Sequence, residues 1–183
     1  MKMNQKVKWI AQTGILLALL VTLQFATGGF GQLVTGSCVN AVLAIAVLLG
    51  GLASGLTVAL CSPVLAFLLH IAPQVLTVPA IMVGNSVYVL LLWLLADRSG
   101  KNLPRQLGAW LLAAAAKAGV LYLLVVKLIC GVLAEKLLAA GTLNEKLMKM
   151  LPTMFSWTQL FTALIGGAAA LLMVPVLRKA LRR

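Results

Sequence analysis

Long uncharged apolar runs make up most of this chain, and its basic residues are concentrated at the ends of those runs. Of the 183 residues, 62% are hydrophobic, 15 are Lys or Arg, and only three are Asp or Glu. Most of the basic residues form three short clusters, namely Lys2/Lys6/Lys8, Arg98/Lys101/Arg105 and Arg178/Lys179/Arg182/Arg183. A soluble domain of this size needs far more polar surface than this composition can supply. The sequence therefore predicts an all-α membrane protein that crosses the bilayer several times.

The positions of the basic clusters predict the topology. Lys and Arg in short loops stay on the cytoplasmic side of the membrane, so both termini and the middle loop are expected there. The number of crossings before and after the middle loop must then be even. The same distribution argues against nucleic-acid binding, because the basic residues do not follow one helix face with aromatic residues between them. We expect contact with anionic lipid headgroups instead, in the inner membrane of a bacterial cell.

Six spans satisfy this condition. Residues 38–69 carry no charge but would form a helix roughly 48 Å long, which exceeds a hydrocarbon core of about 30 Å. The glycine-rich segment 50–55 is therefore expected to divide them into two helices. The prediction is a single six-helix transmembrane domain with spans near 9–26, 38–50, 55–70, 79–96, 105–130 and 153–175. Residues 132–151 are amphipathic and are expected to lie on the outer surface as two short helices divided at Gly141.

Charged residues inside the apolar runs are candidate functional residues, because each is costly in lipid without a partner. Lys117 lies near the middle of the fifth predicted span, and no span contains an Asp or Glu that could neutralise it. A bound anion would supply the missing counter-charge. The alternatives are that Lys117 bonds to helix carbonyls or extends toward the membrane surface. Lys127, nearer the outer end of the same span, either has a functional role or extends toward the membrane surface.

Uncharged polar residues form a second group of candidates. Asn40, Asn85 and Gln159 lie at similar depth in three predicted spans, where they could line a polar cavity or bond one helix to another. His70, the only histidine, lies at a predicted membrane edge as either a ligand contact or an ordinary loop residue. The sequence has no metal-ligand spacing, acid pair, nucleophile with a base, or P-loop. We therefore expect no catalytic residues, no metal or cofactor, and no use of ATP by this chain itself.

Small residues recur on one face of the first predicted span. Gly14, Ala18 and Thr22 are spaced four residues apart, so they lie on one helix face. A stripe of this kind permits close helix approach. It would serve either packing within the protein or docking of another membrane subunit.

Taken together, these features resemble the substrate-binding S-component of an energy-coupling factor (ECF) transporter, over the whole chain. The resemblance extends to the chain length and to six helices with both termini inside. Its motifs are Gly14-x-x-x-Ala18 in place of the family's AxxxA stripe, residues 79–85 ending in Gly84-Asn85, and residues 155–159 followed by Gly166-Gly167. The second and third motifs are similar to helices four and six of the branch that includes folate and pantothenate carriers. The resemblance implies an S-component-like bundle.

The resemblance also implies roles for particular residues. In that family, helices four to six hold the substrate, and two outer loops close over it. Asn40 is added to these candidates because it lies at a similar depth in the membrane. The substrate-binding candidates are then Asn40, Asn85, Lys117, Lys127, Trp157 and Gln159. The candidate gate residues are Gly28, Gly29, Phe30, Gln32 and His70. The implied partners are a transmembrane T-component, expected to dock at Gly14, Ala18 and Thr22, and two ATPase subunits.

Three functions compete at this point. The leading hypothesis is the substrate-specificity subunit of an ECF-type importer, which binds a small, anionic, water-soluble nutrient such as a vitamin. The second is a non-transport membrane assembly or enzyme-accessory subunit, for which a polar cluster facing the cytoplasm would be expected. The third is a stand-alone secondary carrier, which needs an ion-coupling carboxylate or a pair of internal repeats. The sequence shows neither of those two features.

Overall fold

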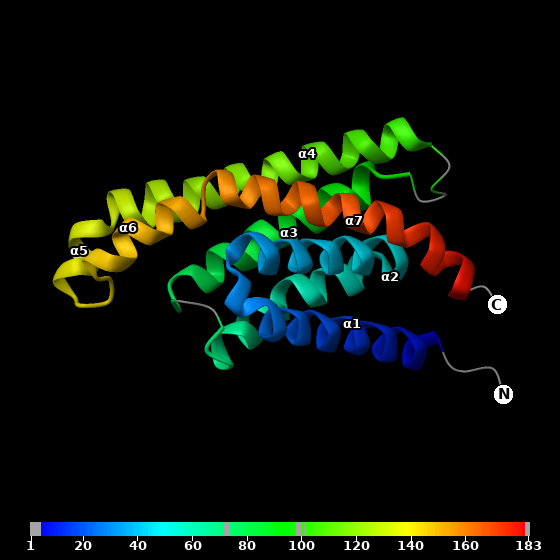
Figure 1. Cartoon of the computed structure of the whole chain (residues 1–183), viewed down its shortest axis with the longest axis horizontal. Coiled ribbons are helices and arrows are strands. Elements are labelled where there is room, and N and C mark those ends of the chain that lie inside the picture. Colours follow the sequence, from blue (N-terminus) through cyan, green and yellow to red (C-terminus); the bar gives the residue numbers. More distant parts are fainter. Residues whose placement is uncertain (1–4, 72–73, 98–99, 101, 182–183) are drawn as a thin grey trace.

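The computed structural model describes residues 5–71, 74–97, 100 and 102–181, and every regular element within them is helical (Figure 1). The elements are α1 (Gln5–Thr27), η1 (Gly28–Phe30), α2 (Gln32–Leu68), α3 (Thr77–Leu95), α4 (Leu103–Leu121), η2 (Tyr122–Val132), α5 (Ala134–Ala139), α6 (Glu145–Met154) and α7 (Trp157–Leu181). Five helical stretches are long and apolar enough to cross a membrane: Lys6–Phe30, Gln32–Leu68, Thr77–Leu95, Leu103–Val132 and Trp157–Ala180. The chain is thus all-helical with several candidate spans, as predicted.

The longest of these stretches, α2, folds back on itself at Gly51. Its 37 residues contain one non-helical position, Gly51, with φ 82° and ψ −177°. A positive φ of this size is accessible to glycine without steric cost. A Cβ added at Gly55 would lie 2.8 Å from the Cβ of Val47, although eight residues along a straight helix span about 12 Å. The break therefore lies within the predicted segment 50–55, and the two halves of α2 lie side by side (Figure 1).

Several predicted helix boundaries are wrong. The second helix begins at Gln32 and not at residue 38. The stretch predicted as one α-helix at 105–130 changes at Tyr122 into the π-helical η2, in which hydrogen bonds skip one more residue. The last helix starts at Trp157 because residues 145–154 form the separate helix α6. It continues through Pro175 to Leu181, since one missing N–H is tolerated in a membrane helix.

Two adjacent glycines in α7 set the close packing at the centre of the bundle. A Cβ at Gly166 would overlap the carbonyl oxygen of Ser37 and lie 2.7 Å from the Cβ of Asn40, both on α2. A Cβ at Gly167 would overlap the indole ring of Trp110 on α4. These glycines therefore serve packing inside the protein, and Gly166 brings α7 against α2 beside Asn40.

The two ends of the bundle differ in the elements and in the basic residues that they carry. The start of α1, the connection between α3 and α4, and the end of α7 lie at one end, whereas α5 and α6 lie at the other (Figure 1). At the first end, Arg178 donates to the carbonyl of Leu48 at 3.1 Å, and Arg105 donates to that of Leu95 at 2.8 Å. The described members of the predicted basic clusters therefore share one end. The other members, Lys2, Arg98, Lys101, Arg182 and Arg183, lie outside the described residues.

Replacing Gly166 with alanine should destabilise the fold by about 1–3 kcal/mol, because the added methyl group has no room between α7 and α2. Gly119→Ala is the matched control, since a Cβ at Gly119 meets nothing within 4 Å and alanine favours the helix. Thermal unfolding of the purified protein in detergent measures both variants. Equal melting temperatures for the two variants would contradict this account of the packing.

Candidate functional site

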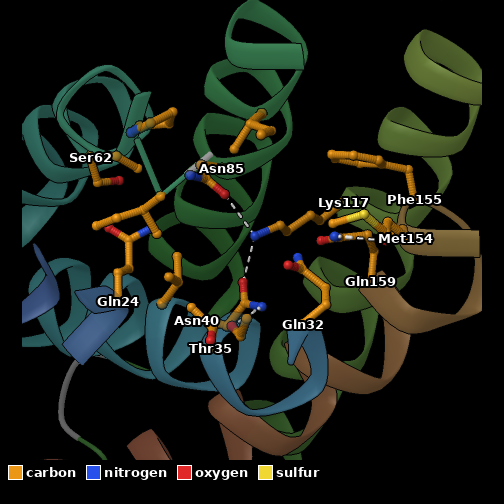
Figure 2. Close-up of a pocket in the computed structure, with 16 residues that line it drawn as sticks. Gln24, Gln32, Thr35, Asn40, Ser62, Asn85, Lys117, Met154, Phe155 and Gln159 are labelled. Carbon is orange, nitrogen blue, oxygen red and sulfur yellow. Dashed lines mark hydrogen bonds between the residues drawn. The ribbon is translucent and has the colours of Figure 1, made fainter. Parts of the chain in front are cut away.

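Lys117 of α4 places its side-chain nitrogen between two asparagines in the interior of the bundle (Figure 2). Its Nζ donates to Oδ1 of Asn40 on α2 at 2.6 Å and to Oδ1 of Asn85 on α3 at 2.7 Å. Lys117 is 2% exposed, and each asparagine is 1% exposed. Lys117 therefore neither extends toward the membrane surface nor takes helix carbonyls as its acceptors here. It joins three helices at one point through side-chain amides.

A chain of hydrogen bonds holds Asn40 in the orientation that Lys117 requires. Nδ2 of Asn40 donates to the carbonyl of Gly36 at 2.9 Å and to the Thr162 hydroxyl at 3.3 Å. Thr162 in turn donates to the carbonyl of Gln159 at 3.0 Å. Because the nitrogen of the Asn40 amide is engaged in this way, its oxygen is the atom that faces Lys117.

No acidic side chain is available within the candidate spans to balance a charge on Lys117. The three acidic residues are Asp97, Glu135 and Glu145, and none belongs to a candidate span. The remaining electrostatic contact is the ring of Tyr88, whose centroid lies 5.5 Å from Nζ. Amide dipoles and an aromatic face stabilise a cation only in part. An anion held beside Nζ would therefore meet an amino group that is already positioned and has no acidic partner.

A cavity of about 100 Å³ opens beside this cluster. Its wall is built by the end of α1, both halves of α2, α3, α4 and the junction of α6 with α7 (Figure 2). Its polar lining is Gln24, Gln32, Thr35, Asn40, Ser62, Asn85, Lys117 and Gln159, and apolar side chains such as Ile81, Met154 and Phe155 complete it. A space of this size and polarity suits a small polar molecule or several water molecules.

The structure brings some of the predicted site residues together and separates others. Asn40, Asn85, Lys117, Gln159 and the predicted gate residue Gln32 all line this one cavity. The other two substrate-binding candidates do not line it. Lys127 is exposed, with Nζ 5.7 Å from the centroid of the Tyr122 ring, and Trp157 is 72% exposed.

The remaining gate candidates lie at the surface. Gly28, Gly29 and Phe30 form the exposed turn η1, in which Phe30 is 75% exposed. His70 follows the end of α2 with φ 57° and is exposed, while its neighbour Ile71 reaches the cavity wall. Residues 72 and 73 of the second predicted outer loop lie outside the described residues. These exposed segments are at the end of the molecule where the cavity lies.

The predicted docking stripe lies on the outside of α1. Gly14, Ala18 and Thr22 are all exposed, and a Cβ at Gly14 would meet nothing within 4 Å. The opposite face of α1 packs inward, where Thr13 donates to the hydroxyl of Ser54 at 3.0 Å and Leu20 is buried. Among the described residues, then, the stripe is not used for packing within this chain.

Sequence reasoning missed part of the polar lining. Gln24 is an amide inside the first apolar run, so the signal that selected Asn40 also applied to it. Thr35 and Ser62 gave a weaker signal, because hydroxyl side chains in membrane helices commonly bond to their own backbone. Phe155 and Met154 are ordinary apolar residues, and only the turn between α6 and α7 brings them to the cavity.

Comparison with protein-family models, with curated proteins and with solved structures found no match. In the part of the chain that the structure describes, no group of three or more His, Cys, Asp or Glu side chains could hold a metal ion. The Lys117 cluster and its cavity are therefore the features that bear on function.

Asn85→Leu should destabilise the protein by about 1–3 kcal/mol, because Nζ of Lys117 stays buried and loses one of its two acceptors. The double variant Lys117→Met/Asn85→Leu should recover most of this loss, since apolar side chains of similar size replace both partners. Thermal unfolding of the two single variants and the double variant measures the coupling. In a parallel cycle, Lys127→Met should simply add to Asn85→Leu. Additive effects in the Lys117 cycle would contradict the assigned contact.

Proposed function

We propose that this chain is the substrate-specificity subunit of an ECF-type importer in a bacterial inner membrane, and that it binds a small anionic nutrient such as a water-soluble vitamin. The observation that carries the proposal is Nζ of Lys117, which Asn40 and Asn85 hold at the wall of a polar cavity. A lysine with no acidic neighbour in the candidate spans favours a ligand that brings the negative charge itself.

The position of the cavity supports binding from outside the cell. In this proposal the chain crosses the membrane six times, once with each half of α2, and the end bearing Arg105 and Arg178 faces the cytoplasm. The cavity is lined by Gln24 near the end of α1, by Gln32 at the start of α2, and by Phe155 just before α7. All three lie toward the end opposite the basic residues, which is the extracellular end in this orientation.

In this proposal the chain binds the substrate and partner subunits supply the energy for uptake. The residue types in the candidate spans support this assignment. Proton- or ion-coupled carriers use carboxylates within the membrane, and the candidate spans here contain none. Energy for uptake would therefore come from partner subunits, namely a T-component and two ATPases. The exposed stripe on α1 is the proposed contact with the T-component, because small residues allow two helices to approach closely.

Lys117→Met should lower the affinity for the natural ligand roughly 30-fold to several thousand-fold, because the ligand's charge would lose its buried partner. The compound that copurifies with the full chain would first be identified by native mass spectrometry, and its affinity then measured by calorimetry in detergent. Lys127→Met is the matched control and should bind like the wild type, since Lys127 lies outside the cavity. A cationic copurified compound, or wild-type affinity in Lys117→Met, would contradict the proposal.

The pair of substitutions Gly14→Leu and Ala18→Leu should abolish uptake in cells while leaving ligand binding by the purified chain unchanged. Bulk on the outer face of α1 would block a partner helix but would not reach the cavity. Gly119→Leu, on an exposed part of α4 with nothing within 4 Å, controls for bulk at the lipid-facing surface. Normal uptake in the α1 variant would remove the docking role.

A further inference from the structure

A second cavity lies at the end of the bundle that carries Arg105 and Arg178, here called the basic end. It is built by the start of α4, the end of α7 and Gly100 of the connection between α3 and α4. Its volume is about 360 Å³, larger than the 100 Å³ of the cavity beside Lys117. Figure 1 shows that the start of α4 and the end of α7 share this end of the molecule. The proposed importer function gives this cavity no role.

The cavity follows one face of α7 from apolar to basic residues. The residues of α7 that line this face are Leu171, Val174, Pro175 and Arg178. They are spaced three or four residues apart, so they lie on one side of the helix. From Leu171 to Arg178 this face extends about 10 Å along the helix axis. Leu103 of α4 adds an apolar side chain to the wall. The cavity is thus an apolar groove with a positive charge at one end.

The guanidinium group of Arg178 is held in place by its surroundings. Its Nη2 donates to the carbonyl of Leu48 at 3.1 Å. Its Nη1 lies beside Gly100, where an added Cβ would come within 2.5 Å of it, and Gly100 lines the cavity. An arginine side chain has five N–H groups, so the bond to Leu48 leaves donors for an anion. Arg178 is half-buried, and a group restrained in this way loses less freedom when it binds a ligand.

The basic groups of this cavity are not matched by acidic ones. Lys179 lines it together with Arg178, and none of the described residues that line it is acidic. Asp97, in the connection between α3 and α4, accepts from the backbone N–H of Asn102 at 2.9 Å and does not belong to the lining. The other polar lining residue, Gln106, donates to the carbonyl of Asp97 at 2.9 Å. The charge of the cavity therefore favours an anionic ligand.

The position of the cavity favours a phospholipid over a soluble anion. Leu103 begins one candidate span, and Arg178 lies close to the end of another. Leu103 is 61% exposed, and Val176 on α7 is 69% exposed, so apolar side chains that can face lipid flank the cavity. A phospholipid places its phosphate at the membrane surface and its acyl chains in the hydrocarbon core. The groove has the same order from Arg178 inward to Leu171, whereas a soluble anion would leave its apolar wall uncovered.

We propose that the cavity between α4 and α7 binds one anionic phospholipid. The phosphate accepts from Arg178 and Lys179, because a guanidinium group matches phosphate oxygens in charge and geometry. One acyl chain lies along Leu103, Leu171 and Pro175. In the orientation given by the proposed function, this lipid belongs to the cytoplasmic leaflet, whose negative surface attracts basic residues. Only that orientation is taken from the proposed function, and the lipid site does not depend on a ligand at Lys117.

The test compares three probes on the full chain in detergent. Phosphatidylglycerol is anionic, phosphatidylcholine with the same acyl chains has no net charge, and glycerol 3-phosphate is a phosphate without acyl chains. Native mass spectrometry over a titration gives the dissociation constant for the first bound lipid. We expect phosphatidylglycerol to bind about tenfold more tightly than phosphatidylcholine, because only its headgroup leaves a net negative charge beside the basic residues. Glycerol 3-phosphate in excess should not displace it.

Substitutions of equal charge separate this site from general attraction to a basic protein. Arg178→Gln, Lys179→Gln and Leu103→Glu should each weaken binding of phosphatidylglycerol at least about fivefold. Arg105→Gln is the matched control and should bind like the wild type. Arg105 lies at the same end and donates to the carbonyl of Leu95 at 2.8 Å, but it does not line the cavity. Lys179 and Leu103 are exposed, so their variants test the site even if Arg178→Gln does not fold.

The outcomes that would overturn the lipid site differ from those that concern the proposed function. Equal binding of the two lipids would overturn it, and so would equal weakening in Arg105→Gln and the three cavity variants. Displacement by glycerol 3-phosphate would show a site for free phosphate and would also overturn it. Lys117→Met should keep the preference for phosphatidylglycerol, because its cavity lies toward the other end of the bundle. Failure of nutrient binding and failure of lipid binding are therefore observed separately.

Discussion

The architecture depends on placing one lysine nitrogen in the interior of an apolar bundle. A charged or polar group there is costly unless acceptors are brought to it, and Lys117 obtains them from Asn40 and Asn85 on two other helices. The helices that carry Asn40 and Asn85 must therefore lie close to α4, and each must be rotated so that its asparagine faces Lys117. On the other side of α2, Gly166 lets α7 pack directly against α2 beside Asn40. The glycine packing and the polar cluster thus support each other.

The parts of the fold that were predictable from sequence follow from the lipid environment. The apolar runs predict helices that are long enough to cross a membrane, and the length limit of a bilayer predicts the break that the structure places at Gly51. The cost of polar groups in lipid also selected Asn40, Asn85, Lys117 and Gln159, which line one cavity. These inferences needed only the position of a residue along the chain.

The parts that were missed depend on helix rotation and on local hydrogen bonding. Lys117 and Lys127 belong to one continuous helical stretch and looked alike, yet one faces the interior and the other is exposed. The change from α-helical to π-helical geometry at Tyr122 alters which side chains face inward. No residue type in that segment predicts this change. The family resemblance predicts Trp157 in the site, but Trp157 is 72% exposed at the start of α7. Such outcomes are set by tertiary packing.

In the proposed function, Nζ of Lys117 is the anchor for an anionic ligand. A high-resolution structure of the full chain in lipid nanodiscs, purified with its copurified compound, tests this most directly. We expect density for an acidic group within about 3 Å of Nζ, the usual length of a charge-assisted hydrogen bond. Density for the compound at another place, with Lys117 still bonded only to Asn40 and Asn85, would contradict it.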